Sequence, residues 1–126
     1  MNPVIHFEMP VGDRDRAADF YAKAFGWHAQ KFGPEMGNYV MVSTADSGPD
    51  GRPKNPGAIN GGLFDKTPDN NVPSVVIGVD DIKAKMKEVT AAGGKLIGEP
   101  MDIPGVGQFI AFLDTEGNRV SMLQPS

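Results

Sequence analysis

The chain has 126 residues, of which 40% are hydrophobic and 22% are charged. This length suits one compact domain, and the composition is typical of a globular protein rather than a disordered one. The net charge of −4 argues against nucleic-acid binding, which requires a basic face, and the absence of cysteine excludes disulfides, thiolate catalysis and cysteine-type zinc sites.

The N-terminal segment has no basic leader of the kind that a signal peptide carries. The longest mostly apolar run, residues 72–79, is too short to cross a bilayer. We therefore expect a soluble, cytoplasmic protein that binds neither nucleic acid nor a membrane.

The first half of the chain predicts a strand, a helix and three further strands. Residues 4–9 alternate apolar and polar side chains, so His6 and Glu8 share one face of a strand. Asp13 is placed to cap a helix over residues 14–25, which carries a helical stripe of apolar residues. The further strands are expected at residues 27–32, 38–44 and 58–64, with a mobile loop at residues 45–57.

Two features of this half concern packing. The helix carries Phe20, Tyr21 and Phe25, which we expect in the core. The last strand contains Gly61 and Gly62, and glycine in a strand often marks the close approach of a ligand or another backbone, or a bend in the sheet.

The second half repeats the pattern after a linker. Residues 74–79 predict a strand with Val75, Ile77 and Val79 on one face, and Asp80 or Asp81 is placed to cap the next helix. The helix carries an apolar stripe of Ile82, Met86 and Val89, and the remaining strands are expected at residues 95–97, 108–113 and 118–123.

An offset of 68 residues aligns the two halves, placing Phe7 on Val75 and Met9 on Ile77. The sequence therefore predicts two tandem βαβββ modules, about residues 1–65 and 73–126, within a single domain of residues 1–126. The fold class is α+β, and we expect a cupped, mostly antiparallel eight-stranded sheet with the helices on its outer face.

The order and spacing of several segments resemble the vicinal oxygen chelate superfamily, the glyoxalase/bleomycin-resistance/dioxygenase group. The similar segments are residues 4–27, residues 76–81 with Gly93-Gly94, and the turn Asp114-Thr115-Glu116-Gly117-Asn118. Residues 57–62 and 103–107 resemble its short, bacterial-type glyoxalase-related group. The resemblance implies a cup that binds a small molecule, in a chain that forms a homodimer.

The metal-dependent members of this superfamily hold their metal with four side chains from the first and last strands of each module. Mapped by resemblance, these positions fall on His6, Asn60, Ser74 and Ser121, and the last is a glutamate in the family pattern. Amide and hydroxyl oxygens are poor ligands for a transition metal. We therefore expect no standard four-ligand metal site and no cofactor. The dioxygenase pattern needs two histidines and a glutamate, and nothing in the sequence positions His28, the only other histidine.

The resemblance places the expected site on the polar face of the first strand. His6 and Glu8 are the candidate catalytic pair, because a carboxylate beside a histidine raises the pKa of the imidazole, orients its ring and allows general-base chemistry. The candidate substrate-binding residues are His6, Glu8, Asn60, Ser74 and Ser121. The aromatic residues Trp27, Tyr39 and Phe109 are candidates for either pocket walls or core packing.

Three functions remain open from the sequence. The first is metal-independent small-molecule binding, as in resistance-type members. The second is a lyase, isomerase or dioxygenase whose divalent metal is held by His6 with Glu8. The third is an interaction domain without a ligand of its own. The residues at the mapped positions favour the first.

Overall fold

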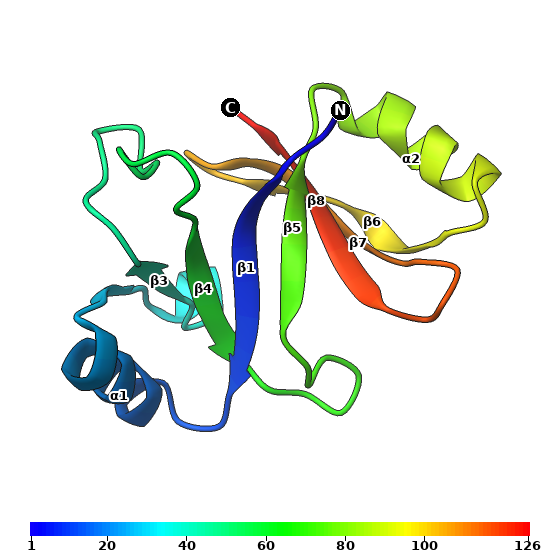
Figure 1. The fold of residues 1–126 in the computed structure, drawn as a ribbon. Helices are drawn as coiled ribbons and strands as arrows, with labels where there is room; N and C mark the ends of the chain where they lie inside the picture. The colour runs from blue at the N-terminus through cyan, green and yellow to red at the C-terminus, as the bar shows by residue number, and fades with distance from the viewer. The chain divides into compact units, whose positions relative to one another are not determined.

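The computed structural model describes all 126 residues and contains eight strands, two α-helices and one short 3-10 helix (Figure 1). The chain divides into two compact units. The N-terminal unit is His6–Pro73, and the C-terminal unit combines Met1–Ile5 with Ser74–Ser126. Neither helix is long and apolar enough to span a membrane.

The N-terminal unit is a four-stranded mixed sheet with one helix. Its elements are β1 (Val4–Val11), α1 (Arg14–Phe25), β2 (His28–Lys31), η1 (Pro34–Met36), β3 (Val40–Ser43) and β4 (Asn60–Asp65). The first two residues of β1 are grouped with the C-terminal unit. The strand order is β2-β3-β4-β1. The β2/β3 and β3/β4 pairs are antiparallel, whereas β1 and β4 run parallel.

The C-terminal unit repeats this plan. Its elements are β5 (Ser74–Gly78), α2 (Ile82–Ala91), β6 (Lys95–Ile103), β7 (Gly107–Leu113) and β8 (Arg119–Pro125). The order is β5-β8-β7-β6, and again the first and last strands of the unit are parallel. The predicted α+β class, with two βαβββ repeats, is confirmed.

The core of the N-terminal unit lies between α1 and one face of its sheet. Val40, Val42 and Leu63 are at most 1% exposed, and Phe7, Met9 and Ala17 pack beside them. Helix α1 begins where expected, because the Asp13 side chain accepts a hydrogen bond from the Arg16 amide, and it ends at Gly26 in the left-handed conformation.

The expected burial of the helix aromatics is only partly right. Phe20 is 56% exposed and Phe25 is 66% exposed, while Tyr21 is half-buried and stacks on Trp27 at 4.6 Å between ring centroids. The helix has a single inner stripe, formed by Ala17, Ala18 and Tyr21, so the remaining aromatics face outward.

The core of the C-terminal unit forms around the predicted stripe of α2. Ile82 is fully buried against Ile110 and Met122, with Met86 and Val89 packed beside them. The expected inward face of β5 needs one correction. Val75 is 40% exposed, whereas Val76, on the other face, is 1% exposed.

Strand β6 is longer than the sequence pattern predicted. It continues past Gly98, Glu99 and Pro100 to Ile103, with an irregular register between Ile97 and Met101. Gly98 has a φ of 72° at this point, a conformation that glycine adopts freely. A bulge of this kind lets a strand resume after a proline that would otherwise end it.

Candidate functional site

The N-terminal unit joins the predicted pair His6 and Glu8 through a third side chain. Alternation along β1 turns both away from the face that packs on α1, onto the helix-free face of the sheet. Tyr39 lies between them, its hydroxyl 2.8 Å from Glu8 Oε2 and 3.0 Å from His6 Nε2. All three side chains are half-buried. We call them the His6–Tyr39–Glu8 triad.

The glycine pair of β4 explains why Tyr39 fits beside β1. The register places Glu8 opposite Gly62, and a Cβ atom built at Gly62 would overlap the Tyr39 ring and hydroxyl. On the other face, a Cβ atom at Gly61 would overlap the ring of Phe7. The sequence pointed to a ligand, another backbone or a bend at these glycines, and the structure instead places two side chains of the same unit against them.

The turn that leads into β3 is fixed by Arg14 of α1. Its Nη1 donates hydrogen bonds to the carbonyl oxygens of Phe32, at 2.6 Å, and Asn38, at 3.1 Å. The Phe32 amide donates to the Tyr39 carbonyl at 2.9 Å, and Asn38 takes a φ of 57°. These bonds hold the backbone immediately before Tyr39, so Arg14 positions the aromatic ring at the triad.

Burial determines the protonation of the triad. It lowers the pKa of His6 from 6.5 to about 4, and it raises the pKa of Glu8 from 4.5 to about 7, although the hydrogen bond from Tyr39 partly opposes the second effect. The pKa of Tyr39 is raised by burial, and further by the charge of Glu8 and the hydrogen bond to it.

These directions correct one expectation from the sequence. Glu8 was expected to raise the pKa of His6, but Tyr39 stands between the two groups and desolvation lowers that pKa instead. At neutral pH His6 and Tyr39 are therefore uncharged, while Glu8 is close to the midpoint of its titration.

The hydrogen-bond chain also assigns the proton positions. When Tyr39 gives its only hydroxyl proton to the Glu8 carboxylate, its oxygen accepts from His6, so Nε2 carries the imidazole proton and Nδ1 keeps a lone pair. When Glu8 is protonated, both bonds are free to reverse direction. The triad can therefore hold one proton and redistribute it along three side chains.

Asn60 is the register partner of His6 across β1 and β4, so its side chain lies on the same face of the sheet as His6, and it is 5% exposed. Its Oδ1 accepts from the Thr44 amide at 2.9 Å, and its Nδ2 donates to Ser47 Oγ at 2.9 Å and to the Gly51 carbonyl at 3.1 Å. The two bonds that Nδ2 donates tie the loop of residues 45–57 to β4. Asn60 thus has a structural role that the sequence did not indicate, and its contact with a substrate stays a prediction.

Ser74 and Ser121 belong to the C-terminal unit. Ser121 pairs with Val76 across β5 and β8, and the alternation of β5 places Ser74 on the same face as Val76, opposite the α2 core. Both serines therefore occupy the helix-free face of their own unit. The convergence of the five expected binding residues on one hollow stays a prediction.

Three other candidate residues divide between the units. Trp27 packs on Phe7 and Tyr21 in the N-terminal unit, so it belongs to the core there. Phe109 pairs with Leu123 in the C-terminal unit. His28 is exposed on β2. The residue that the sequence undervalued is Tyr39, and the only signal for it was the glycine pair on the neighbouring strand.

The sequence matches the Glyoxalase/Bleomycin resistance protein/Dioxygenase superfamily over residues 4–122. The chain belongs to this superfamily. A "Glyoxylase-like domain-containing protein" of Didymella fabae is 34% identical, over 88% of this chain and 84% of its own length.

Further relatives carry more specific names. A "Probable lactoylglutathione lyase, chloroplastic" of Arabidopsis thaliana is 30% identical over 91% of this chain, which spans only 33% of that protein. Among solved structures, a variant of Streptomyces coelicolor methylmalonyl-CoA epimerase matches with a TM-score of 0.71 at 16% identity, over 100% of this chain and 96% of that one. This last similarity shows the fold alone.

The side chains at the four positions that the resemblance maps onto metal ligands do not fit a divalent transition metal. In the N-terminal unit, His6 Nε2 is hydrogen-bonded to Tyr39, and the Asn60 amide is engaged with the loop. In the C-terminal unit the corresponding positions hold Ser74 and Ser121, whose hydroxyls are weak ligands. Of the four donors, only the imidazole is a strong one.

Proposed function

We propose that this superfamily member binds a small organic molecule on the helix-free face of its N-terminal unit, and that Glu8 exchanges a proton with it without a metal. One observation carries the proposal: the Tyr39 hydroxyl bridges Glu8 Oε2 and His6 Nε2 in a half-buried setting. Asn60, Ser74 and Ser121 belong to the proposal as further polar contacts, and a homodimer as the assembly.

The electrostatics of Glu8 suit proton transfer at neutral pH. A general base is most effective when its pKa is close to the working pH, and burial raises the pKa of Glu8 to about 7. Tyr39 occupies Oε2, which leaves Oε1 as the oxygen that takes a proton from the bound molecule and returns it. His6 stays neutral and donates a hydrogen bond from Nε2 to the Tyr39 oxygen.

The names of the relatives suggest the first compounds to test. Lactoylglutathione and methylmalonyl-CoA are both thioesters, and each has an acidic hydrogen on the carbon next to its carbonyl group. A carboxylate with a raised pKa is a suitable base for such a hydrogen. Thioesters with this hydrogen are therefore the proposed substrate class.

The test is isotope exchange in D2O, followed by NMR, with methylmalonyl-CoA and lactoylglutathione as probes. We expect the protein to accelerate loss of the signal from that hydrogen, before and after treatment with EDTA. Glu8→Gln should slow the exchange by about 100-fold or more, whereas Glu99→Gln, at an exposed carboxylate of β6, should leave it unchanged. Absence of exchange with both probes, or unchanged exchange in Glu8→Gln, would refute the proposal.

The second candidate is a lyase that uses a divalent metal, and the name of the Arabidopsis thaliana relative favours it. His6 would have to release Tyr39 before Nε2 could bind a metal. Elemental analysis of protein purified without chelators separates the two candidates. A stoichiometric metal that is lost in His6→Ala would favour the lyase, provided that EDTA also abolishes the exchange.

A further inference from the structure

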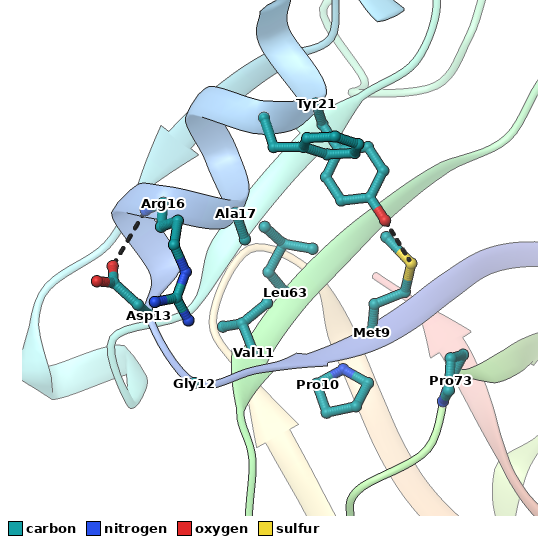
Figure 2. Close-up of a pocket in the computed structure, with 11 residues that line it drawn as sticks. Met9, Pro10, Val11, Gly12, Asp13, Arg16, Ala17, Tyr21, Leu63 and Pro73 are labelled. Carbon is teal, nitrogen blue, oxygen red and sulfur yellow. Dashed lines mark hydrogen bonds between the residues drawn. The ribbon is translucent and has the colours of Figure 1, made fainter. Parts of the chain in front are cut away.

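A second hollow lies in the N-terminal unit, where β1 meets the start of α1. It is an open groove with a volume of about 540 Å³, within the range of small-molecule sites, roughly 300–1,000 Å³. Its apolar floor consists of Met9, Val11 and Leu63, from the sheet face that packs on α1, together with Ala17 of α1 itself (Figure 2). The triad occupies the other face of this sheet, so the groove is a separate site.

The rim of the groove presents rigid apolar surface. Pro10 and Pro73 line it, and so does Phe20, which is 56% exposed and meets Tyr21 edge-to-face at 5.0 Å between ring centroids. Proline rings and a phenylalanine ring lose little conformational freedom when a ligand covers them. An exposed aromatic side chain beside a preformed hollow is typical of a binding surface for a flat apolar group.

One cation at the rim has no acidic partner. The ion pairs of the chain are Lys31 with Asp15 and Lys85 with Glu88, so the Arg16 guanidinium takes part in neither. Figure 2 shows Arg16 reaching from α1 toward Gly12. Asp13 also lines the groove, but its Oδ1 is engaged as the helix cap by the Arg16 amide at 3.0 Å.

A second donor at the groove is weakly satisfied. The Tyr21 hydroxyl donates only to the thioether of Met9, at 3.8 Å, as Figure 2 also shows. Sulfur of this kind is a weak acceptor, so an oxygen acceptor on a ligand would replace it favourably. The groove therefore combines apolar walls with two available donors, of which one is a guanidinium.

From this combination we infer that the groove binds a small aromatic carboxylate, whose ring lies against Phe20 and the prolines and whose carboxylate pairs with Arg16. A guanidinium binds a carboxylate through two parallel hydrogen bonds, which a neutral amide cannot match. A second polar atom on such a ligand would reach Tyr21. This inference is independent of the proton-transfer proposal for Glu8.

The experiment compares phenylacetate with phenylacetamide, a neutral molecule of nearly the same shape, by NMR titration of backbone amides. We expect saturable shifts in α1 around Arg16 to Tyr21 with millimolar or tighter affinity for the acid, and binding of the amide at least about five-fold weaker. The only tryptophan, Trp27, stacks on Tyr21, so its fluorescence gives a second readout.

Two variants separate specific binding from adhesion to an apolar surface. Arg16→Gln changes an exposed side chain and should weaken the acid to the level of the amide, whereas Lys23→Gln, at an exposed cation of α1 outside the groove, should bind as the wild type does. Shifts that do not saturate, equal affinity for acid and amide, or unchanged affinity in Arg16→Gln would overturn the inference. So would shifts centred on Tyr39 and Gly62.

Discussion

The opposite protonation preferences of His6 and Glu8 predict that substituting one or the other makes stability depend on pH, with opposite signs in the two variants. The folded-state pKa of Glu8, about 7, lies above its ordinary 4.5, so its contribution is fully present below pH 4.5 and is lost as the pH rises toward 7. The folded-state pKa of His6, about 4, lies below 6.5, so its contribution is fully present above pH 6.5 and is lost as the pH falls toward 4.

Both pKa values are displaced over a similar range, so the two effects nearly cancel between pH 5 and 6.5 in the wild type. At about 1.4 kcal/mol per pH unit, and allowing for partial titration at the ends of this interval, each group alone changes the free energy of unfolding by about 1.5 kcal/mol. Glu8→Gln should therefore become more stable as the pH rises, and His6→Gln less stable.

Urea denaturation at pH 5.0 and 6.5, at constant ionic strength, measures both variants against the wild type. The pKa values of Asp15 and Asp114 are lowered, by Lys31 and by Asn118 respectively, so these exposed carboxylates titrate below the interval. If the two variants change in the same direction with pH, the assignment of a neutral histidine and a proton-retaining glutamate is wrong.

Two further predictions concern β4. Gly62→Ala should displace Tyr39 and lower the free energy of unfolding by about 1–3 kcal/mol. The control is Gly12→Ala, where a Cβ atom would meet nothing closer than 3.9 Å, and it should change the free energy of unfolding by less than about 1 kcal/mol. Urea denaturation measures both variants, and equal losses of stability would contradict the overlap at Gly62. Asn60→Ala should speed amide hydrogen exchange in the loop of residues 45–57 more than in the sheet, because two hydrogen bonds to that loop and one to the Thr44 amide just before it are removed. Unchanged loop protection would show that Asn60 does not anchor it.

Much of the fold follows from local patterns in the sequence. Alternation along β1, the capping aspartate of α1 and the glycine after it determine a strand, a helix start and a helix end within short stretches of chain. The extension of β6 could not be predicted in this way, because whether Gly98 ends a strand or makes a bulge depends on pairing with β7. The exposure of Phe20 and Phe25 likewise depends on how much of α1 the sheet covers.

The candidate site was predictable only in part, for a related reason. Strand periodicity places His6 and Glu8 on one face, but the bridging role of Tyr39 joins residues more than thirty positions apart. It depends on the space above Gly62 and on a turn held by Arg14. The direction of each pKa change depends on burial, which periodicity does not measure.

The adjacent glycines of β4 also limit how this protein can vary. Phe7 rests on Gly61 on one side of the strand, and Tyr39 rests on Gly62 on the other. At this point only the backbone of β4 separates the hydrophobic core of the unit from the His6–Tyr39–Glu8 triad. A substitution that enlarges a core side chain or shifts the backbone at this point would therefore also displace Tyr39. Core packing and the geometry of the His6–Tyr39–Glu8 triad are coupled at this strand.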